Sequence, residues 1–253
     1  MIFKRIYLFL LLILLPINIV AKNISVGFVC ENSIKCENLK KLVGNEYKIS
    51  DINHADILIC DTIDGVKKCL KYNKKIIAID IYSYQIPLIQ SPKIIGYFPV
   101  DVPLSFMINY ITKKLGKNLK KCVLSHYKYY STEKGYDFYY VKNINDVPFV
   151  LNKALKKCDI IISVPDKVVY NYFSTRFIFK RVILGGKLIT GFSKDMIDLG
   201  AVYSFEINRK KYFKRILNFL NEISEYSKFS KVFCPDKGEI NSYENEKIIK
   251  CIK

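Results

Sequence analysis

The sequence contains no tryptophan, only two histidines (His54 and His126), and 23 acidic residues against 41 Lys and Arg. Because histidines are few and no C-x-x-C pair occurs, the sequence lacks the usual spacings of zinc and redox sites. We therefore expect no metal and no cofactor. Walker A, G-x-G-x-x-G and G-x-S-x-G signatures are absent, and no carboxylate pair has a His partner at an interpretable spacing. We therefore expect that the protein is not an enzyme.

The chain has 253 residues, of which half are hydrophobic and a quarter are charged. This composition excludes the disordered and low-complexity classes. The length fits one large domain or two small lobes. The formal charge of +18 could attract anionic lipid headgroups, nucleic acid or acidic proteins. Its lysine pairs are dispersed along the chain, which is more typical of a solvated surface, and we expect no nucleic-acid partner.

Residues 1–21 have the layout of a signal peptide. Lys4 and Arg5 precede an apolar run of ten residues, Pro16 breaks the run, and Ala21 offers a small residue for cleavage. A retained membrane anchor is the alternative, but the run is short for a bilayer about 30 Å thick. Cleavage removes two cations and no acid, so the charge falls from +18 to +16. We expect a periplasmic or secreted protein without a lipid-modified cysteine.

Short runs rich in Ile and Val alternate with helix-like segments through the remaining chain. Continuous apolar runs are typical of strands that are buried on both faces of a parallel sheet. The runs that we expect to form strands are 23–30, 55–62, 74–82, 93–98, 120–127, 136–142, 157–165, 187–192 and 201–205. The segments that we expect to form helices are 34–42, 64–72 (with Asp64 as N-cap), 101–115, 146–156, 170–184 and 209–226.

This rhythm occurs twice and predicts an α/β protein of two Rossmann-like lobes with a ligand cleft between them. We expect a first lobe at 22–100, a crossover or hinge helix region at 101–118, and a second lobe at 119–205. A C-terminal helix and tail at 206–253 would return toward the first lobe. The halves share this layout without an obvious residue-level repeat.

Ligands of open parallel sheets bind beyond the carboxyl ends of the strands, and two facing lobes place those ends around one cleft. Polar and aromatic residues follow most of the expected strands. The residues that we expect to contact a ligand are Asn32, Ser33, Asp61, Thr62, Ser83, Tyr84, Ser125, His126, Tyr127, Asp166, Tyr170, Asn171, Phe192 and Ser193.

Residues 159–205 resemble the second lobe of ABC transporter substrate-binding proteins with a type I periplasmic-binding-protein fold. The matching features are VPD and VY after a buried strand, a helix with Thr175 and Arg176, the run Gly191-Phe192-Ser193 after a strand, and LGAVYS. A looser likeness extends over about 94–226. The resemblance implies a monomeric solute-binding protein that closes over a small organic ligand, of which an amino-acid-like molecule is one possibility. Such a protein delivers its ligand to an ABC permease in the inner membrane.

The first lobe departs from that family, because only about 20 residues separate Cys30 from Asp51 and the region looks shortened. The alternative function is therefore an interaction protein or sensor accessory without transport, on a degenerate binding-protein scaffold. Gene neighbours encoding a permease and an ATPase would favour transport. A stable protein complex with no ligand would favour the alternative.

Several site residues have a second interpretation. The helix that begins near Tyr170 and Asn171 can hold a carboxylate at its N-terminus, but Tyr170 is equally explained as a core aromatic. Asp166 is either a cleft acid or a turn acid, and Arg176 either binds an anion or pairs on the surface. His126 follows a buried strand, where a lone histidine is more often only hydrogen-bonded.

Eight cysteines follow the leader, an even number that suggests disulfides in an exported chain. In a lobe with strand order 2-1-3-4-5 the first and third strands are neighbours. Cys122 and Cys158 stand at the start of these two strands, so we predict a disulfide between them. Cys30–Cys36 and Cys234–Cys251 are further local possibilities.

Overall fold

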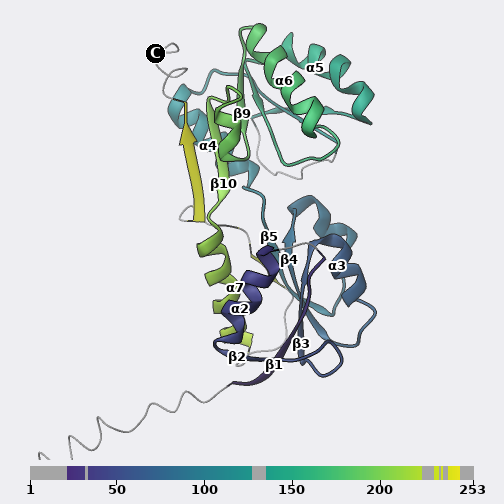
Figure 1. The fold of residues 1–253 in the computed structure, drawn as a ribbon. Helices are drawn as coiled ribbons and strands as arrows, with labels where there is room; N and C mark the ends of the chain where they lie inside the picture. Colours follow the sequence, from purple (N-terminus) through teal and green to yellow (C-terminus); the bar gives the residue numbers. More distant parts are fainter. Residues whose placement is uncertain are drawn as a thin grey trace, which may run out of the picture.

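The computed structural model describes residues 22–31, 34–126, 135–223, 231–233, 235 and 239–245. Their strands form two six-stranded sheets, one in each of the two lobes that lie one above the other in Figure 1. The strand orders are β11-β5-β4-β3-β1-β2 and β12-β10-β9-β8-β6-β7. Both sheets therefore have the 2-1-3-4-5 order followed by one edge strand, and the expected α/β class is confirmed. Only β12 runs antiparallel to its neighbour in the described pairings.

The strands of the first sheet are β1 (Lys22–Val29), β2 (Tyr47–Ile49), β3 (Ile57–Asp61), β4 (Lys75–Ile81), β5 (Ile94–Pro99) and β11 (Lys231–Val232). Those of the second sheet are β6 (Lys121–Ser125), β7 (Asp137–Tyr140), β8 (Ile160–Ile162), β9 (Leu188–Gly191), β10 (Tyr203–Ile207) and β12 (Ile240–Glu244). The α-helices are α2 (Ile34–Gly44), α3 (Thr62–Cys69), α4 (Leu104–Leu115), α5 (Val147–Leu155), α6 (Tyr172–Leu184) and α7 (Arg209–Ile223). Three short 3-10 helices are η1 (Ser83–Leu88), η2 (Ile144–Asp146) and η3 (Lys194–Ile197).

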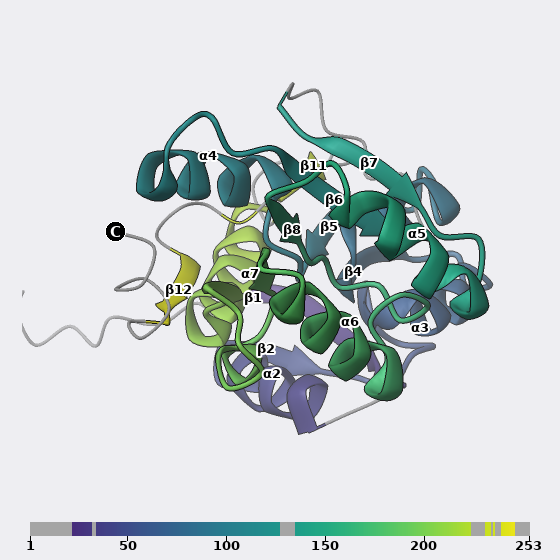
Figure 2. The same cartoon turned by 90° about the horizontal axis from the view of Figure 1, so that it is seen from above.

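The central strands β3 and β4 of the first sheet are mostly apolar because both faces of the sheet are covered. In β3, Ile57 and Ile59 belong to the core on one face, whereas Leu58 and Cys60 belong to the core on the other. Helices α2 and α7 cover the first of these faces and α3 covers the second (Figure 1). In the second lobe, α5 and α6 lie on the side opposite to α4, as Figure 2 also shows from above.

Three connections join the two sheets: from β5 to α4, from β10 to α7, and from β11 to β12. Helix α4 packs on the second lobe, where the ring of Tyr110 contacts the rings of Tyr203 and Phe205. Helix α7 packs on the first lobe, where Phe219 contacts Phe98. None of the helices in the described part of the chain is long and apolar enough to cross a membrane.

Helices begin later or earlier than the sequence pattern predicts. The N-cap of α3 is Asp61, not Asp64, and the helix starts at Thr62 directly after the strand. Helix α4 starts at Leu104 after Pro103 instead of at residue 101. The interval between residues 31 and 50, which we expected to be shortened, holds a helix of 11 residues (α2) and a strand of three (β2). We did not predict β2, β11 or β12.

Three disulfides lie within the described residues. Cys122 and Cys158 are bonded across the first and third strand positions of the second lobe, with Cα atoms 5.9 Å apart, which confirms this prediction. Cys30 and Cys36 are also bonded, whereas the bond from Cys60 in β3 to Cys69 in α3 was not predicted. Residues 1–21, with the expected signal peptide, and the possible pair Cys234–Cys251 lie outside the described residues.

The two lobes also share an arrangement that fixes the amino ends of their strands, away from the cleft. Asp56, just before β3, accepts hydrogen bonds from the backbone N–H and hydroxyl of Ser25 at 2.8 and 2.7 Å. Asp159, just before β8, accepts one from the backbone N–H of Lys120 at 3.0 Å. In each lobe an aspartate thus ties the third strand position to the first, a residue-level correspondence that the sequence alone did not reveal.

Candidate functional site: a cleft between the lobes

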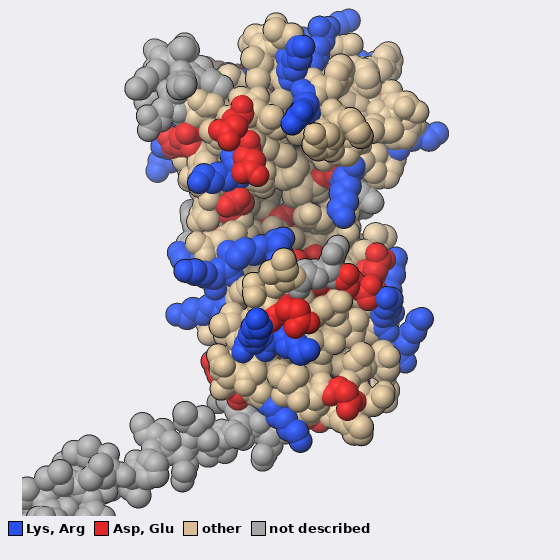
Figure 3. All heavy atoms as spheres, in the orientation of Figure 1, with Lys and Arg blue, Asp and Glu red and all other residues tan. Residues whose placement is uncertain are grey.

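Two adjoining cavities lie between the lobes at the carboxyl ends of the strands. The hinge cavity has a volume of about 310 Å³ and is lined by Lys35, Tyr82, Val100, Asp101, Val102, Met107, Pro165, Phe192, Ser193, Phe205, Glu206, Ile207 and Arg209. The lower cavity, about 530 Å³, is lined by Glu31, Lys35, Thr62, Ile63, Asp64, Asp80, Tyr82, Gln85, Val100, Lys167 and Arg209. Because Lys35, Tyr82, Val100 and Arg209 line both, the two cavities form one cleft. Figure 3 shows the waist between the lobes where this cleft lies.

Two aromatic rings reach the hinge cavity from opposite lobes. Tyr82 follows β4 and stacks on Tyr84, with ring centroids 5.6 Å apart and planes at 8°. Phe192 follows β9 and packs edge-on against the buried ring of Tyr170 at 5.7 Å. Tyr82 and Phe192 each therefore have a second aromatic ring packed against them, which restricts their position at the cavity.

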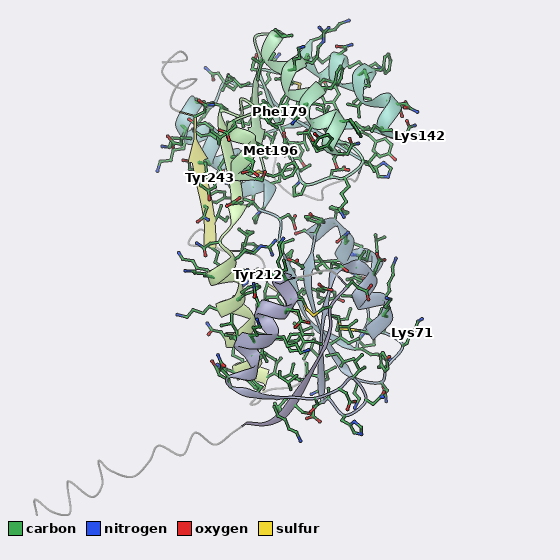
Figure 4. The ribbon with its side chains drawn as sticks, in the orientation of Figure 1. Lys71, Lys142, Phe179, Met196, Tyr212 and Tyr243 are labelled. Carbon is green, nitrogen blue, oxygen red and sulfur yellow. A yellow bond between two sulfur atoms is a disulfide. The ribbon has the colours of Figure 1, made fainter. Side chains whose placement is uncertain are left out.

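Arg209 lies at the start of α7, where the chain returns from the second lobe to the first. Its guanidinium forms an ion pair with Asp80 at 2.5 Å, and both residues line the lower cavity. The hydroxyl of Tyr212, labelled in Figure 4, accepts a hydrogen bond from the Asp80 backbone N–H and donates one to the Phe98 carbonyl. Side chains of α7 thus hold the ends of β4 and β5 at the cleft.

The backbone at the lower cavity has an unusual conformation at two positions. Thr62 has a φ of 59° and Asp80 a φ of 54°, the left-handed region that residues other than glycine rarely adopt. Both residues line the lower cavity. Strained backbone of this kind is concentrated at ligand-binding sites, which supports a functional role for this end of the sheet.

Asp101 places a buried carboxyl group on the connection from β5 to α4. It is 3% exposed and accepts hydrogen bonds from the backbone N–H and hydroxyl of Ser83 at 2.7 and 3.0 Å. Burial raises the pKa of Asp101 to about 6, against the opposing effect of the Ser83 hydrogen bonds. Burial also raises the pKa of the neighbouring Tyr82. The hinge cavity therefore contains a carboxyl group that titrates near neutral pH.

The structure brings only some of the expected ligand contacts to the cleft. Thr62, Phe192 and Ser193 line a cavity. Ser83 and Tyr84 lie one step behind the lining residues, where they contact Asp101 and Tyr82. Asn32, Ser33 and Tyr127 lie outside the described residues.

Two expected carboxylates hold loops rather than face the cavities. Asp166 is 2% exposed and accepts hydrogen bonds from the Ser125 hydroxyl at 2.7 Å and the His126 backbone N–H at 2.5 Å. Asp61 is equally buried and accepts one from the Glu31 backbone N–H at 2.6 Å. In each lobe, an acid at or beyond the carboxyl end of the third strand position fixes the backbone just after the first strand.

The N-terminus of α6, expected to hold a ligand carboxylate, is already capped. The Asn171 side chain accepts hydrogen bonds from the backbone N–H groups of Phe173 and Ser174, both at 3.0 Å. These are the donors that an anion would need. Tyr170 is buried behind Phe192, and the His126 ring lies 3.0 Å from the Val141 carbonyl oxygen.

Most of the residues that line the two cavities were not among the ligand contacts predicted from the sequence. Lys35 lies on α2, and Val100 and Arg209 lie on connections between the lobes, so a search at strand ends does not reach them. Tyr82 lies one residue before the pair that we chose after β4. A signal for Arg209 was available, since it is a cation at the point where the chain returns to the first lobe. Within the described residues, no group of three or more His, Cys, Asp or Glu is placed to hold a metal ion.

No protein-family model and no curated protein matches the sequence. Among solved structures, the fold is similar to an ABC domain in complex with L-Trp from Streptococcus pneumonia (15% identity, TM-score 0.54, 91% of this chain and 94% of that chain). It is also similar to the ligand-free, open structure of a substrate-binding protein with adhesive properties from Clostridium difficile (11%, 0.58, 90% and 94%). A glucose-galactose binding protein from Geobacillus stearothermophilus is a third (8%, 0.52, 89% and 98%). The chain thus has the two-lobed fold of type I periplasmic substrate-binding proteins.

Proposed function

We propose that this protein is a solute-binding protein that captures a small polar organic molecule between its lobes. The observation that carries the proposal is the hinge cavity, which is lined by both lobes and by two of the three connections between them. A ligand in such a cavity contacts both lobes at once and so stabilises their closure. The solved structures of similar fold include an ABC domain in complex with L-Trp and a glucose-galactose binding protein.

The chemistry of the cleft favours an amino-acid-like ligand with an apolar or aromatic part. Tyr82 and Phe192 offer ring faces from the two lobes, and Lys35 and Arg209 offer positive charge for a carboxylate. Glu206 offers negative charge for an ammonium group in the same cavity. A cavity of about 310 Å³ is at the small end of the range for ligand sites, which suits a single amino acid better than an oligomer.

The remaining features follow from this role. We propose that the protein works outside the cytoplasm as a monomer, delivers its ligand to an ABC permease, and performs no catalysis. We propose lobe boundaries at 22–100 and 119–205, with 101–118 and 206–253 as connecting regions. The three disulfides fit an exported protein, since such bonds persist in oxidising compartments.

Isothermal titration calorimetry against amino acids and monosaccharides tests the proposal. We expect at least one aromatic or large apolar amino acid to bind, and Tyr82→Ala or Phe192→Ala to weaken its binding by tenfold or more. Phe149→Ala is the matched control, because Phe149 is an exposed ring on α5 that lines neither cavity. Equal losses in all three variants, or no binding across the panel, would contradict the proposal.

A further inference from the structure

Helix α6 is apolar on two faces. Ile178, Phe179 and Val182 are buried against the second sheet. On the outer side, Tyr172 is 70% exposed, Phe173 80% and Leu184 72%, and Phe177 and Ile183 are each 43% exposed. A folded protein gains nothing in stability from large apolar side chains held in water. A contiguous set of them marks an interaction surface.

The neighbouring helix α5 extends this surface and adds positive charge. Its Phe149 is 63% exposed, and α5 contacts α6 directly. We call the set the α5–α6 surface; its members are Phe149, Lys153, Tyr172, Phe173, Arg176, Phe177, Lys180, Ile183 and Leu184. In Figure 3 the upper right of the molecule, over these helices, is largely tan with blue at its margins.

The charges on the α5–α6 surface have a single sign. Neither α5 nor α6 contains an Asp or Glu residue. The Arg176 guanidinium lies 5.2 Å from the Tyr172 ring centroid, and the Lys153 ammonium lies 4.1 Å from that of Phe149. Because these cations lie on aromatic rings, positive charge adjoins apolar surface, and one partner can contact the two together.

This arrangement distinguishes between partners. A second copy of the chain would bring Lys153, Arg176 and Lys180 toward their own equivalents, with no acid on either helix to compensate. A partner must therefore be negatively charged and must also accept aromatic rings. An anionic lipid surface has both properties, since aromatic rings lie at headgroup depth and each nearby Lys or Arg is attracted to the negatively charged headgroups.

We propose that the α5–α6 surface binds an anionic lipid surface, with Phe173, Phe177 and Leu184 entering the headgroup region and Arg176 and Lys180 contacting lipid phosphates. This surface lies outside the cleft, because none of its members lines either cleft cavity. The inference does not depend on the proposed function.

Sedimentation with vesicles of phosphatidylglycerol and phosphatidylcholine in equal parts, compared with phosphatidylcholine alone, tests the proposal. We expect the wild type to bind the anionic vesicles, and Phe173→Ser/Phe177→Ser to weaken binding tenfold or more. Leu88→Ser is the apolar control, because Leu88 is 61% exposed in η1 of the first lobe. Thermal melting before sedimentation confirms that each variant is folded.

A basic protein can also bind anionic vesicles without a specific surface, and a second pair of variants separates the two cases. Arg176→Gln/Lys180→Gln is compared with Lys210→Gln/Lys214→Gln, an equal charge change at exposed positions of α7. We expect only the first pair to weaken binding markedly. Equal losses of binding from both pairs of variants, or no binding by the wild type, would overturn the proposal. A wild type that is a dimer, with Phe173→Ser/Phe177→Ser a monomer, would overturn it as well.

Discussion

The buried carboxyl group of Asp101, on the connection from β5 to α4, leads to a specific prediction about stability and pH. Asp101 has a pKa of about 6 in the folded protein, because it is almost fully buried, against 3.8 as its ordinary value. Below about pH 3.8 the carboxyl group is protonated in both the folded and the unfolded protein, so it does not change the free energy of unfolding. Between about pH 3.8 and pH 6 only the folded protein keeps the proton, so the free energy of unfolding falls as the pH rises. Above about pH 6 the group is ionised in both states and the loss of stability is complete.

The size of the loss follows from the difference between the two pKa values. One pKa unit corresponds to about 1.4 kcal/mol, so ionisation of Asp101 costs about 3 kcal/mol at neutral pH. Asp101→Asn keeps an oxygen that can accept from Ser83 but cannot ionise. Relative to the wild type, we expect this variant to gain about 3 kcal/mol in unfolding free energy between about pH 3.5 and pH 7.

Urea unfolding of both proteins across this pH range measures the difference directly. Asp56→Asn is the control, because hydrogen bonds from Ser25 lower the pKa of Asp56. Wild-type Asp56 contributes stability above its ordinary pKa that is lost as the pH falls, so its variant should show the opposite trend, confined to acid pH. A pH-independent difference for Asp101→Asn, or one that favours the wild type as the pH rises, would refute the reasoning.

Three further changes test the scaffold. Replacing both Cys122 and Cys158 by Ala should lower the unfolding free energy by about 3–4 kcal/mol, since the bond closes a loop of sequence separation 36; unchanged urea unfolding would argue against the bond. Asn171→Ala should cost about 1 kcal/mol by removing the cap of α6, with Asn171→Asp as a control that keeps the cap. Gly191→Ala places a Cβ 2.5 Å from that of Met196 and should lower the free energy of unfolding by about 1–3 kcal/mol, seen as a lower melting temperature. An unchanged melting temperature would show that the close approach is absent.

Sequence patterns predicted the central strands well because those strands lie in continuous, mostly apolar runs. Both faces of each sheet are covered, so β3, β4 and the three-residue β8 consist mainly of Ile, Leu, Ala and Cys, which stand out from their surroundings. The edge strands β2 and β11 have three and two residues, too few to carry a periodic signal. Strand β12 reads INSYE and is held by pairing with β10 rather than by burial of an apolar face.

The two cavities lie at the edge of the sheets where we expected ligand contacts, but a largely different set of residues lines them. After β4 we chose Ser83 and Tyr84, whereas Asp80 and Tyr82 line the cleft. The pairing of β4 with β5 shifts register between Ile79 and Ile81, and Asp80 adopts a positive φ there. This irregularity changes which side chains face the cleft, and no sequence motif marks it. The disulfide from Cys60 to Cys69 likewise depends on how α3 packs on β3.

Native mass spectrometry of the purified protein tests the central claim most directly. The account predicts a species heavier than the bare chain by the mass of one small organic molecule, either as purified or after incubation with a mixture of amino acids. Tyr82→Ala/Phe192→Ala should abolish that species, whereas Phe149→Ala should retain it. The bare mass under all conditions, or an adduct that the cleft variant binds equally well, would contradict the claim that the cleft between the lobes holds a ligand.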